Sequence, residues 1–271
     1  MNERVNRLRQ ESYETPVRIS AERAELVTDF YRENIGKHST PVTRALAFEH
    51  LCRHKTIHIG ADELIVGERG PRPKAVSTYP ELTCHSEEDL RILDSRPMTP
   101  YAVAEADLAI YKDKVIPFWR GRTMRERIFE GLSDEWQAAY DAGIFTEFME
   151  QRAPGHTTLD GKFYSKGLLD FKKDIENRMD RIEFRRDPDA ARKREQLRAM
   201  AITCDAVILF AKRHAELADK MAAAETEPQR RGELERIAAN CRRVPAHPPS
   251  DFWEALQMYW FMHLGTITEL N

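Results

Sequence analysis

A long apolar segment near the C-terminal end places the strongest constraint on this chain. Residues 251–264, DFWEALQMYWFMHL, present apolar side chains around almost the whole helical circumference. Such a helix must be buried. The next residues, TITEL (266–270), are rich in β-branched side chains, which predicts a strand. Because a lone strand leaves its backbone groups unpaired, we expect the 271 residues to be part of a larger fold.

Helical periodicity runs through most of the remaining sequence. The expected helices span residues 21–34, 42–54, 86–94, 101–117, 122–131, 133–152, 166–184, 188–223, 226–241 and 251–264. Ser20 and Ser250 are expected N-caps, and Pro41 is expected to open a helix. Residues 56–67 predict a small strand pair, and the three prolines in 69–85 predict an extended loop. Since no repeat or low-complexity linker interrupts the pattern, no internal domain boundary is expected.

Charge and hydropathy exclude several classes of protein. Lys and Arg total 42 and Asp and Glu total 45, so the formal net charge is -3. The charges alternate along helical faces, which is typical of solvated surfaces and argues against a nucleic-acid partner. No run of eighteen apolar residues occurs, and the N-terminus lacks the apolar core of a secretion signal. We therefore expect a cytoplasmic protein with no membrane association.

The cysteines and histidines were considered as ligands. The four cysteines are widely spaced and form no CxxC pair, which favours reduced thiols: Cys52, Cys84, Cys204 and Cys241. His50, His54 and His58 recur every four residues, a spacing that lets two histidines share a metal on one helical face. The predicted strand around His58 would break that repeat, and no carboxylate or second thiol completes the set. No metal is expected.

The segment 145–158, FTEFMEQRAPGHTT, combines an amphipathic helix with an abrupt stop. Its apolar stripe at i, i+3 and i+4 is continued at i+7 by Arg152. Pro154 excludes the preceding residue from the α region, and Gly155 can adopt a positive φ. His156 is therefore presented from a bend. By itself, a histidine in this setting is more often a surface or capping residue than a functional one, and Arg152 could simply form a salt bridge with Glu147 or Glu150.

Four segments resemble the N-terminal part of the glycyl radical enzyme family, which includes pyruvate formate-lyase and radical dehydratases of diols and hydroxyproline. They are DELIVGERG (62–70), FTEFMEQRAPGHT (145–157), VPAHPPSDFWEALQMYWF (244–261) and TITELN (266–271). The resemblance implies the mainly α-helical N-terminal portion of a ten-stranded α/β barrel with a few short strands. Residues 1–271 would form one incomplete domain, without the C-terminal glycine radical domain.

The family resemblance also implies a chemistry. An activating enzyme that uses S-adenosylmethionine installs a glycine-centred radical, which oxidises a cysteine that then removes a hydrogen atom from the substrate. No segment of this sequence matches the cysteine or glycine loops of the family, and no directly bound cofactor is expected. The partners implied are a small-molecule substrate, the activating enzyme and, at full length, a second copy of the chain.

The resemblance assigns roles to two residues of the 145–158 segment, and two of their neighbours are further candidates. His156 matches a histidine that hydrogen-bonds the substrate hydroxyl in the dehydratases, so it is the catalytic candidate. Phe148 matches an aromatic residue that packs on the substrate ring. Arg152 and Gln151 lie within one turn and are candidates for holding a substrate carboxylate.

Three functions remain open at this stage. The first is the N-terminal part of a dehydratase that acts on hydroxyproline or a similar small hydroxylated substrate. The second is another glycyl radical lyase, of the carbon–sulfur, carbon–nitrogen, diol dehydratase or formate acetyltransferase type. The third is a non-catalytic helical fragment, since 271 residues without the radical glycine and cysteine could not perform this chemistry alone.

Overall fold

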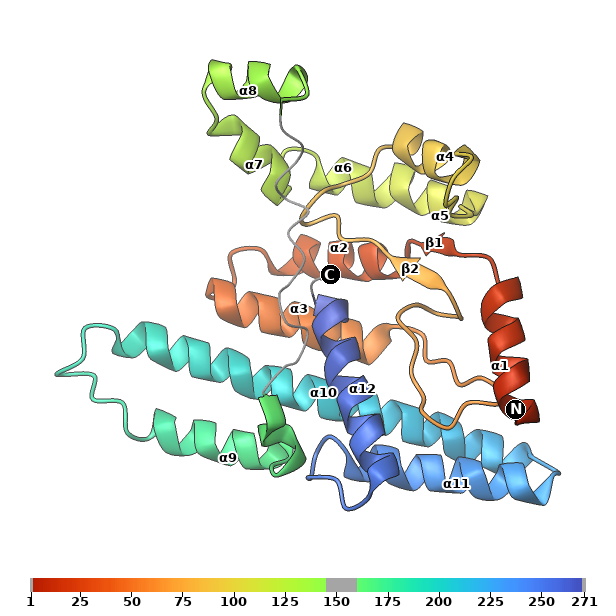
Figure 1. Cartoon of the computed structure of the whole chain (residues 1–271). Helices are drawn as coiled ribbons and strands as arrows, with labels where there is room; N and C mark the ends of the chain where they lie inside the picture. Colours follow the sequence, from red (N-terminus) through yellow and green to blue (C-terminus); the bar gives the residue numbers. More distant parts are fainter. Residues whose placement is uncertain (1, 145–159, 270–271) are drawn as a thin grey trace.

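The computed structural model describes residues 2–144 and 160–269, and this part of the chain is mainly helical (Figure 1). The N-terminal half contains α1 (Glu3–Glu14), β1 (Arg18–Ser20), α2 (Glu22–Asn34), α3 (Thr40–His54), β2 (Ala75–Ser77), α4 (Glu87–Ser95), α5 (Glu105–Ile110), the π-helix η1 (Tyr111–Val115), α6 (Ile116–Trp119), α7 (Met124–Glu130) and α8 (Asp134–Asp141). The C-terminal half contains the 3₁₀-helix η2 (Asp160–Tyr164), α9 (Leu168–Met179), α10 (Ala190–Ala224), α11 (Pro228–Arg243) and α12 (Phe252–Glu269).

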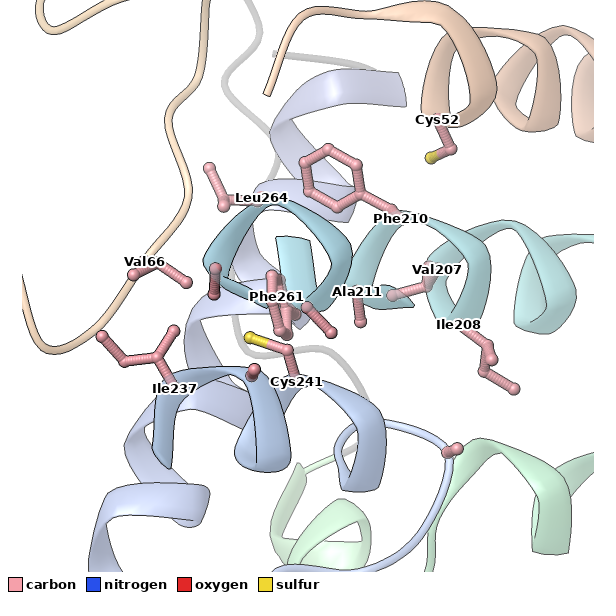
Figure 2. Close-up of a cluster of buried hydrophobic side chains, with 14 of the residues drawn as sticks. Cys52, Val66, Val207, Ile208, Phe210, Ala211, Ile237, Cys241, Phe261 and Leu264 are labelled. Carbon is pink, nitrogen blue, oxygen red and sulfur yellow. The ribbon is translucent and has the colours of Figure 1, made fainter. Parts of the chain in front are cut away.

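The largest core lies where α10, α11 and α12 meet (Figure 2). The 35-residue helix α10 buries a stripe of small residues at i, i+4, i+7 and i+11: Ala211, Ala215, Ala218 and Ala222. Small side chains allow neighbouring helices to approach closely. Phe210 of α10 and Phe261 of α12 meet edge to face, with ring centroids 6.0 Å apart. The apolar segment at the start of the sequence analysis is thus buried as predicted.

A second core lies under α2 and the helical run from α5 to α6. Tyr111 is fully buried there, and its hydroxyl donates to Thr78 Oγ1 at 2.5 Å. The run was predicted as one helix over 101–117, but it begins at Glu105 and includes a π-helical turn. Pro117 explains that turn, because its ring lacks an N–H and clashes with an ordinary α-helical carbonyl four residues earlier.

The β-structure differs from the sequence prediction. The described strands, β1 and β2, form a short parallel pair with Ile19 opposite Val76. The strand pair expected at 56–67 is wrong, because backbone groups of this loop bond to side chains of other elements rather than to a second strand. The strand expected at 266–269 is also wrong. These residues continue α12, since Phe261, Leu264 and Thr268 extend its buried face at i, i+3 and i+7 and tertiary burial outweighs β-propensity.

Several helix boundaries also differ. Of the helix expected over 133–152, the structure has α8, which ends at Asp141, and residues 145–152 lie outside the described residues. Helix α9 ends at Met179 instead of residue 184. Helix α1 was not predicted, because it buries no side chain and so has no apolar period. Asp251, and not Ser250, caps α12: Glu254 N donates to Asp251 Oδ1 at 2.9 Å. The other expected helices are confirmed to within a few residues.

Candidate functional site

A buried arginine of α2 joins three parts of the chain. Arg23 is 5% exposed, and its guanidinium uses all five N–H groups. Nε donates to Thr268 O at 2.7 Å and Nη2 to Glu269 O at 2.9 Å, both at the C-terminal end of α12. Nη1 donates to Thr78 O at 3.1 Å, and Glu81 accepts one bond from each Nη atom at 3.2 and 2.5 Å. We call Arg23, Thr78, Tyr79, Glu81, Thr268 and Glu269 the Arg23 junction.

The junction binds carbonyls in the last turn of α12 that the structure describes. Carbonyl oxygens attract a nearby cation, because each carries the negative end of a peptide dipole. Arg23 supplies two donors to them, and the Tyr79 hydroxyl donates to Ile267 O. The Arg23 guanidinium also lies 4.0 Å from the centroid of the Tyr79 ring, a favourable cation–π distance. Arg44 adds an exposed ion pair with Glu269.

The junction also reaches the base of helices α7 and α8. Thr123 caps α7 by accepting from Glu126 N at 3.1 Å. The next two amides, Met124 N and Arg125 N, have no partner within the helix and donate to Glu81 O and Leu82 O, each at 3.0 Å. Figure 1 shows α7 and α8 projecting from the rest of the described structure. Arg23 therefore connects α12 to this projecting pair through one residue, Glu81.

A second buried cation lies beside Arg23. Lys55, at the end of α3, is 5% exposed. Its Nζ donates to Arg69 O at 3.1 Å, Glu68 O at 3.3 Å and Thr268 Oγ1 at 3.4 Å. Burial lowers the pKa of Lys55 to about 8, because desolvation disfavours the charged form. The space enclosed here is about 10 Å³, enough for one water molecule at most. These residues hold chain segments together; they do not form a substrate pocket.

Loop 60–70 is fastened along α12 by three polar side chains of that helix. Trp253 Nε1 donates to Leu64 O and Trp260 Nε1 to Gly67 O, each at 2.7 Å. Between them, the buried Gln257 amide accepts from Val66 N and donates to Val66 O, both at 2.8 Å. Gly67 has a φ of 126°, and a Cβ at this position would lie 2.5 Å from Leu264 Cδ1. Only glycine fits so close to α12.

The same loop carries a perturbed carboxyl group. Burial, reinforced by the nearby Glu63 carboxylate, raises the pKa of Glu68 to about 7. Burial also raises the pKa of Glu63, whose Oε2 accepts from Gly60 N at 2.8 Å. Glu68 can therefore exchange a proton near neutral pH.

A wider hollow of about 380 Å³ lies between β1, α2 and α5. Its charged lining mixes cations with carboxylates: Arg18, Arg72, Glu22, Glu25, Asp94 and Asp107. The two aspartates are already engaged, since Asp94 accepts from Val103 N at 2.9 Å and Asp107 from Ala21 N at 2.8 Å. Because its lining carries both positive and negative side chains, the hollow favours neither anionic nor cationic ligands.

The four residues predicted to contact substrate lie outside the described residues. Phe148, Gln151, Arg152 and His156 belong to the segment 145–159. Along the chain, that segment follows α8 directly. Their roles remain predictions, while the base of the helix pair that precedes them is bonded to Glu81 of the Arg23 junction.

The histidines and cysteines considered as ligands are placed as follows. The rings of His50 and His54 on α3 are tilted against each other with centroids 4.5 Å apart, while His58 lies beyond the end of that helix. Within residues 2–144 and 160–269, no group of three or more histidine, cysteine or carboxylate side chains is arranged to hold a metal ion. All four cysteines are free, and burial raises the pKa of Cys52, Cys84 and Cys241 to about 12 and that of Cys204 to about 11. These thiols stay protonated at neutral pH.

Arg23 and Lys55 were not predicted as buried cations, although the sequence carries a signal for each. Arg23, Val27 and Phe30 fall at i, i+4 and i+7, and all three are buried. Lys55 continues the buried stripe of Leu51 in the same way. The signal is a cation inside an apolar stripe, the same pattern that Arg152 shows in the sequence.

The whole chain, residues 1–271, matches the family model described as pyruvate formate lyase-like. The chain belongs to this family, which confirms the resemblance predicted from four of its segments. Across the described part of the chain, no helix has the length and apolarity needed to span a bilayer.

Two curated relatives show the extent of the similarity. Trans-4-hydroxy-L-proline dehydratase of Clostridioides difficile is 47% identical over 269 residues, which cover 99% of this chain and 34% of the relative. Isethionate sulfite-lyase of Oleidesulfovibrio alaskensis is 34% identical over 258 residues, covering 91% of this chain and 31% of the relative. The chain therefore spans about a third of the length of the relatives it matches.

A solved structure has the same fold over the matched part. The crystal structure of hydroxyproline dehydratase from C. difficile with trans-4-hydroxy-L-proline bound superposes with a TM-score of 0.94 at 46% identity. The match covers 99% of this chain and 34% of that structure. The helical architecture described above is therefore shared with a dehydratase over nearly every residue of this chain.

Proposed function

We propose that this chain is the N-terminal third of a glycyl radical dehydratase that eliminates water from trans-4-hydroxy-L-proline. The supporting observation is the match, 47% identical over 99% of the chain, to a dehydratase of this substrate. In this proposal, residues 1–271 form outer helices and the beginning of a ten-stranded α/β barrel. The catalytic unit is the whole enzyme, which acts as a homodimer and includes the glycine radical domain.

The residues of this chain would bind and orient the substrate. A glycine radical, installed by a separate S-adenosylmethionine-dependent activating enzyme, supplies the hydrogen-abstraction chemistry in the proposed enzyme. His156 would donate a hydrogen bond to the departing hydroxyl, since an imidazole N–H can deliver a proton near neutral pH. Arg152, with Gln151, would bind the substrate carboxylate through the planar guanidinium. Phe148 would pack against the pyrrolidine ring.

The substrate is tested by turnover of the activated full-length enzyme. We expect loss of trans-4-hydroxy-L-proline with formation of a dehydrated product, and no turnover of isethionate or of 1,2-propanediol. Isethionate is the critical competitor, because an isethionate sulfite-lyase is 34% identical to this chain. Turnover of isethionate but not hydroxyproline would replace dehydration with carbon–sulfur cleavage as the function.

The site is tested by His156→Ala in the same enzyme. Removing a positioned proton donor should lower kcat by roughly 10²-fold or more. His247→Ala is the matched control, because His247 is exposed in the loop before α12. Both variants should take up the same amount of glycyl radical, measured by electron paramagnetic resonance. Wild-type turnover by His156→Ala would remove His156 from the proposed site.

A further inference from the structure

The projecting helices α7 and α8 are described in full, and no side chain of either helix is buried. Their contacts include one between themselves, where Phe129 and Tyr140 meet with ring centroids 4.9 Å apart. We call this pair the α7–α8 arm, and backbone hydrogen bonds attach its base to another part of the described chain.

The base of the arm is attached through backbone hydrogen bonds to loop 78–82. Met124 N and Arg125 N donate to Glu81 O and Leu82 O, while the buried Thr123 caps α7. These bonds fix the arm to the loop but do not fix the loop to the rest of the protein. That second connection includes the guanidinium of Arg23, beside bonds from the Tyr111 hydroxyl to Thr78 Oγ1 and from the Tyr79 hydroxyl to Ile267 O.

Arg23 holds loop 78–82 against the C-terminal end of α12. It binds Thr78 O and both carboxylate oxygens of Glu81 on one side, and the carbonyls of Thr268 and Glu269 on the other. The Tyr79 ring packs on the guanidinium, and its hydroxyl bonds to α12 as well. A lysine has its three donors on one atom and could not make these bonds at once.

We propose that Arg23 is a positioning residue for the dehydration: it fixes the α7–α8 arm relative to the end of α12. This inference rests on the proposed function, since the chain continues from the arm to His156 and from α12 to the remainder of the enzyme. The carboxylate and the main-chain carbonyl of Glu81 act together, the first bound to Arg23 and the second to α7. Displacements of about 1 Å can cost a large fraction of turnover even when they originate far from the reacting atoms.

The test uses the full-length enzyme with Arg23→Lys, Arg23→Met and Glu81→Gln. Arg230→Lys is the matched control, because Arg230 also clamps backbone carbonyls, donating to Glu63 O at 2.8 Å and Gly60 O at 3.0 Å far from the arm. The first measurement is hydrogen exchange of peptides containing Met124 and Arg125. The second is kcat and KM per glycyl radical.

We expect exchange at Met124 and Arg125 to accelerate roughly tenfold or more in the Arg23 variants, as the arm opens locally. We expect kcat/KM for hydroxyproline to fall roughly tenfold in Arg23→Lys. Arg230→Lys should lose thermal stability while hydrogen exchange at Met124 and Arg125 and kcat/KM stay at wild-type values. A general loss of stability would then not explain the changes in Arg23→Lys. If Arg23→Met does not fold, Arg23→Lys and Glu81→Gln carry the comparison.

Unchanged exchange at Met124 and Arg125 would overturn the proposed attachment of the arm, whatever the substrate. Accelerated exchange with unchanged kcat/KM would overturn the positioning role. A wild-type enzyme that turns over another substrate would contradict the proposed function only, because kcat/KM of the Arg23 variants can then be measured on that substrate.

Discussion

The core between α10, α11 and α12 and the Arg23 junction are both buried, but they are held by opposite kinds of interaction. The core consists of alanines and large apolar side chains in contact over broad surfaces (Figure 2). The junction and the neighbouring Lys55 place two buried cations side by side, bonded mostly to backbone carbonyls. Apolar contact is non-directional and tolerates small displacements, whereas hydrogen bonds to a guanidinium require a particular geometry. The core supplies stability, and the junction determines where chain segments lie.

The comparison extends to α12, which takes part in both regions. Its apolar face, including Phe261 and Leu264, packs into the core. Its polar side chains Trp253 and Gln257 bind loop 60–70, and its last carbonyls bind Arg23. One helix can therefore be perturbed by apolar truncation, by loss of a polar bond or by a change of charge at its end.

Phe261→Ala should have the largest effect on stability. Phe261 is fully buried between α10 and α11, and truncation would leave a cavity, costing about 3–5 kcal/mol in the free energy of unfolding. Phe252→Ala is the control, because Phe252 lies on the same helix and is 77% exposed. Urea unfolding of both variants makes the comparison. A loss below about 1 kcal/mol for Phe261→Ala would show that this core does not dominate stability.

Gln257→Leu should cost about 2 kcal/mol, because it leaves Val66 N and Val66 O without partners at a buried position. The substitution keeps an apolar side chain of similar size, so cavity formation contributes little. Gln10→Leu, at an exposed position on α1, should be nearly neutral. If Gln257→Leu were neutral as well, the attachment of loop 60–70 would depend on apolar contact instead of these bonds.

Lys55→Met tests the buried charge beside the junction and should have the smallest effect. The pKa of Lys55 is about 8 in the folded protein, against an ordinary value of 10.5 in the unfolded chain. Between these two pH values the unfolded chain binds the proton and the folded protein does not. Stability contributed by Lys55 should therefore rise with pH, by about 1 kcal/mol per pH unit above pH 8. Lys55→Met should lack this rise in urea unfolding measured from pH 7 to 10. Parallel profiles for both proteins would show that Lys55 keeps its ordinary pKa.

The sequence predicted the helices whose apolar residues recur with a helical period. It did not predict the elements that depend on contacts with other parts of the chain. Helices α2, α3, α10, α11 and α12 were expected because their buried residues recur with a helical period. Helix α1 was missed because ion pairs attach it, including Arg7 with Asp62 at 2.5 Å. The β-branched residues at 266–268 suggested a strand, but α12 continues through them because Thr268 is buried and its carbonyl is bound by Arg23. Family membership was predicted from four segments and is confirmed, whereas Phe148, Gln151, Arg152 and His156 remain predicted site residues.

By itself, the sequence determined the helical class, the burial of residues 251–264 and the family, because apolar periods and long collinear segments are properties of the chain alone. The tertiary structure decided that loop 60–70 lies along α12, that Arg23 is buried and that one guanidinium joins α12 to the base of the α7–α8 arm. The physical reason is that a buried cation is stable only where several acceptors converge on it. Those acceptors come from residues 78–81 and 268–269, and only folding brings them to residue 23.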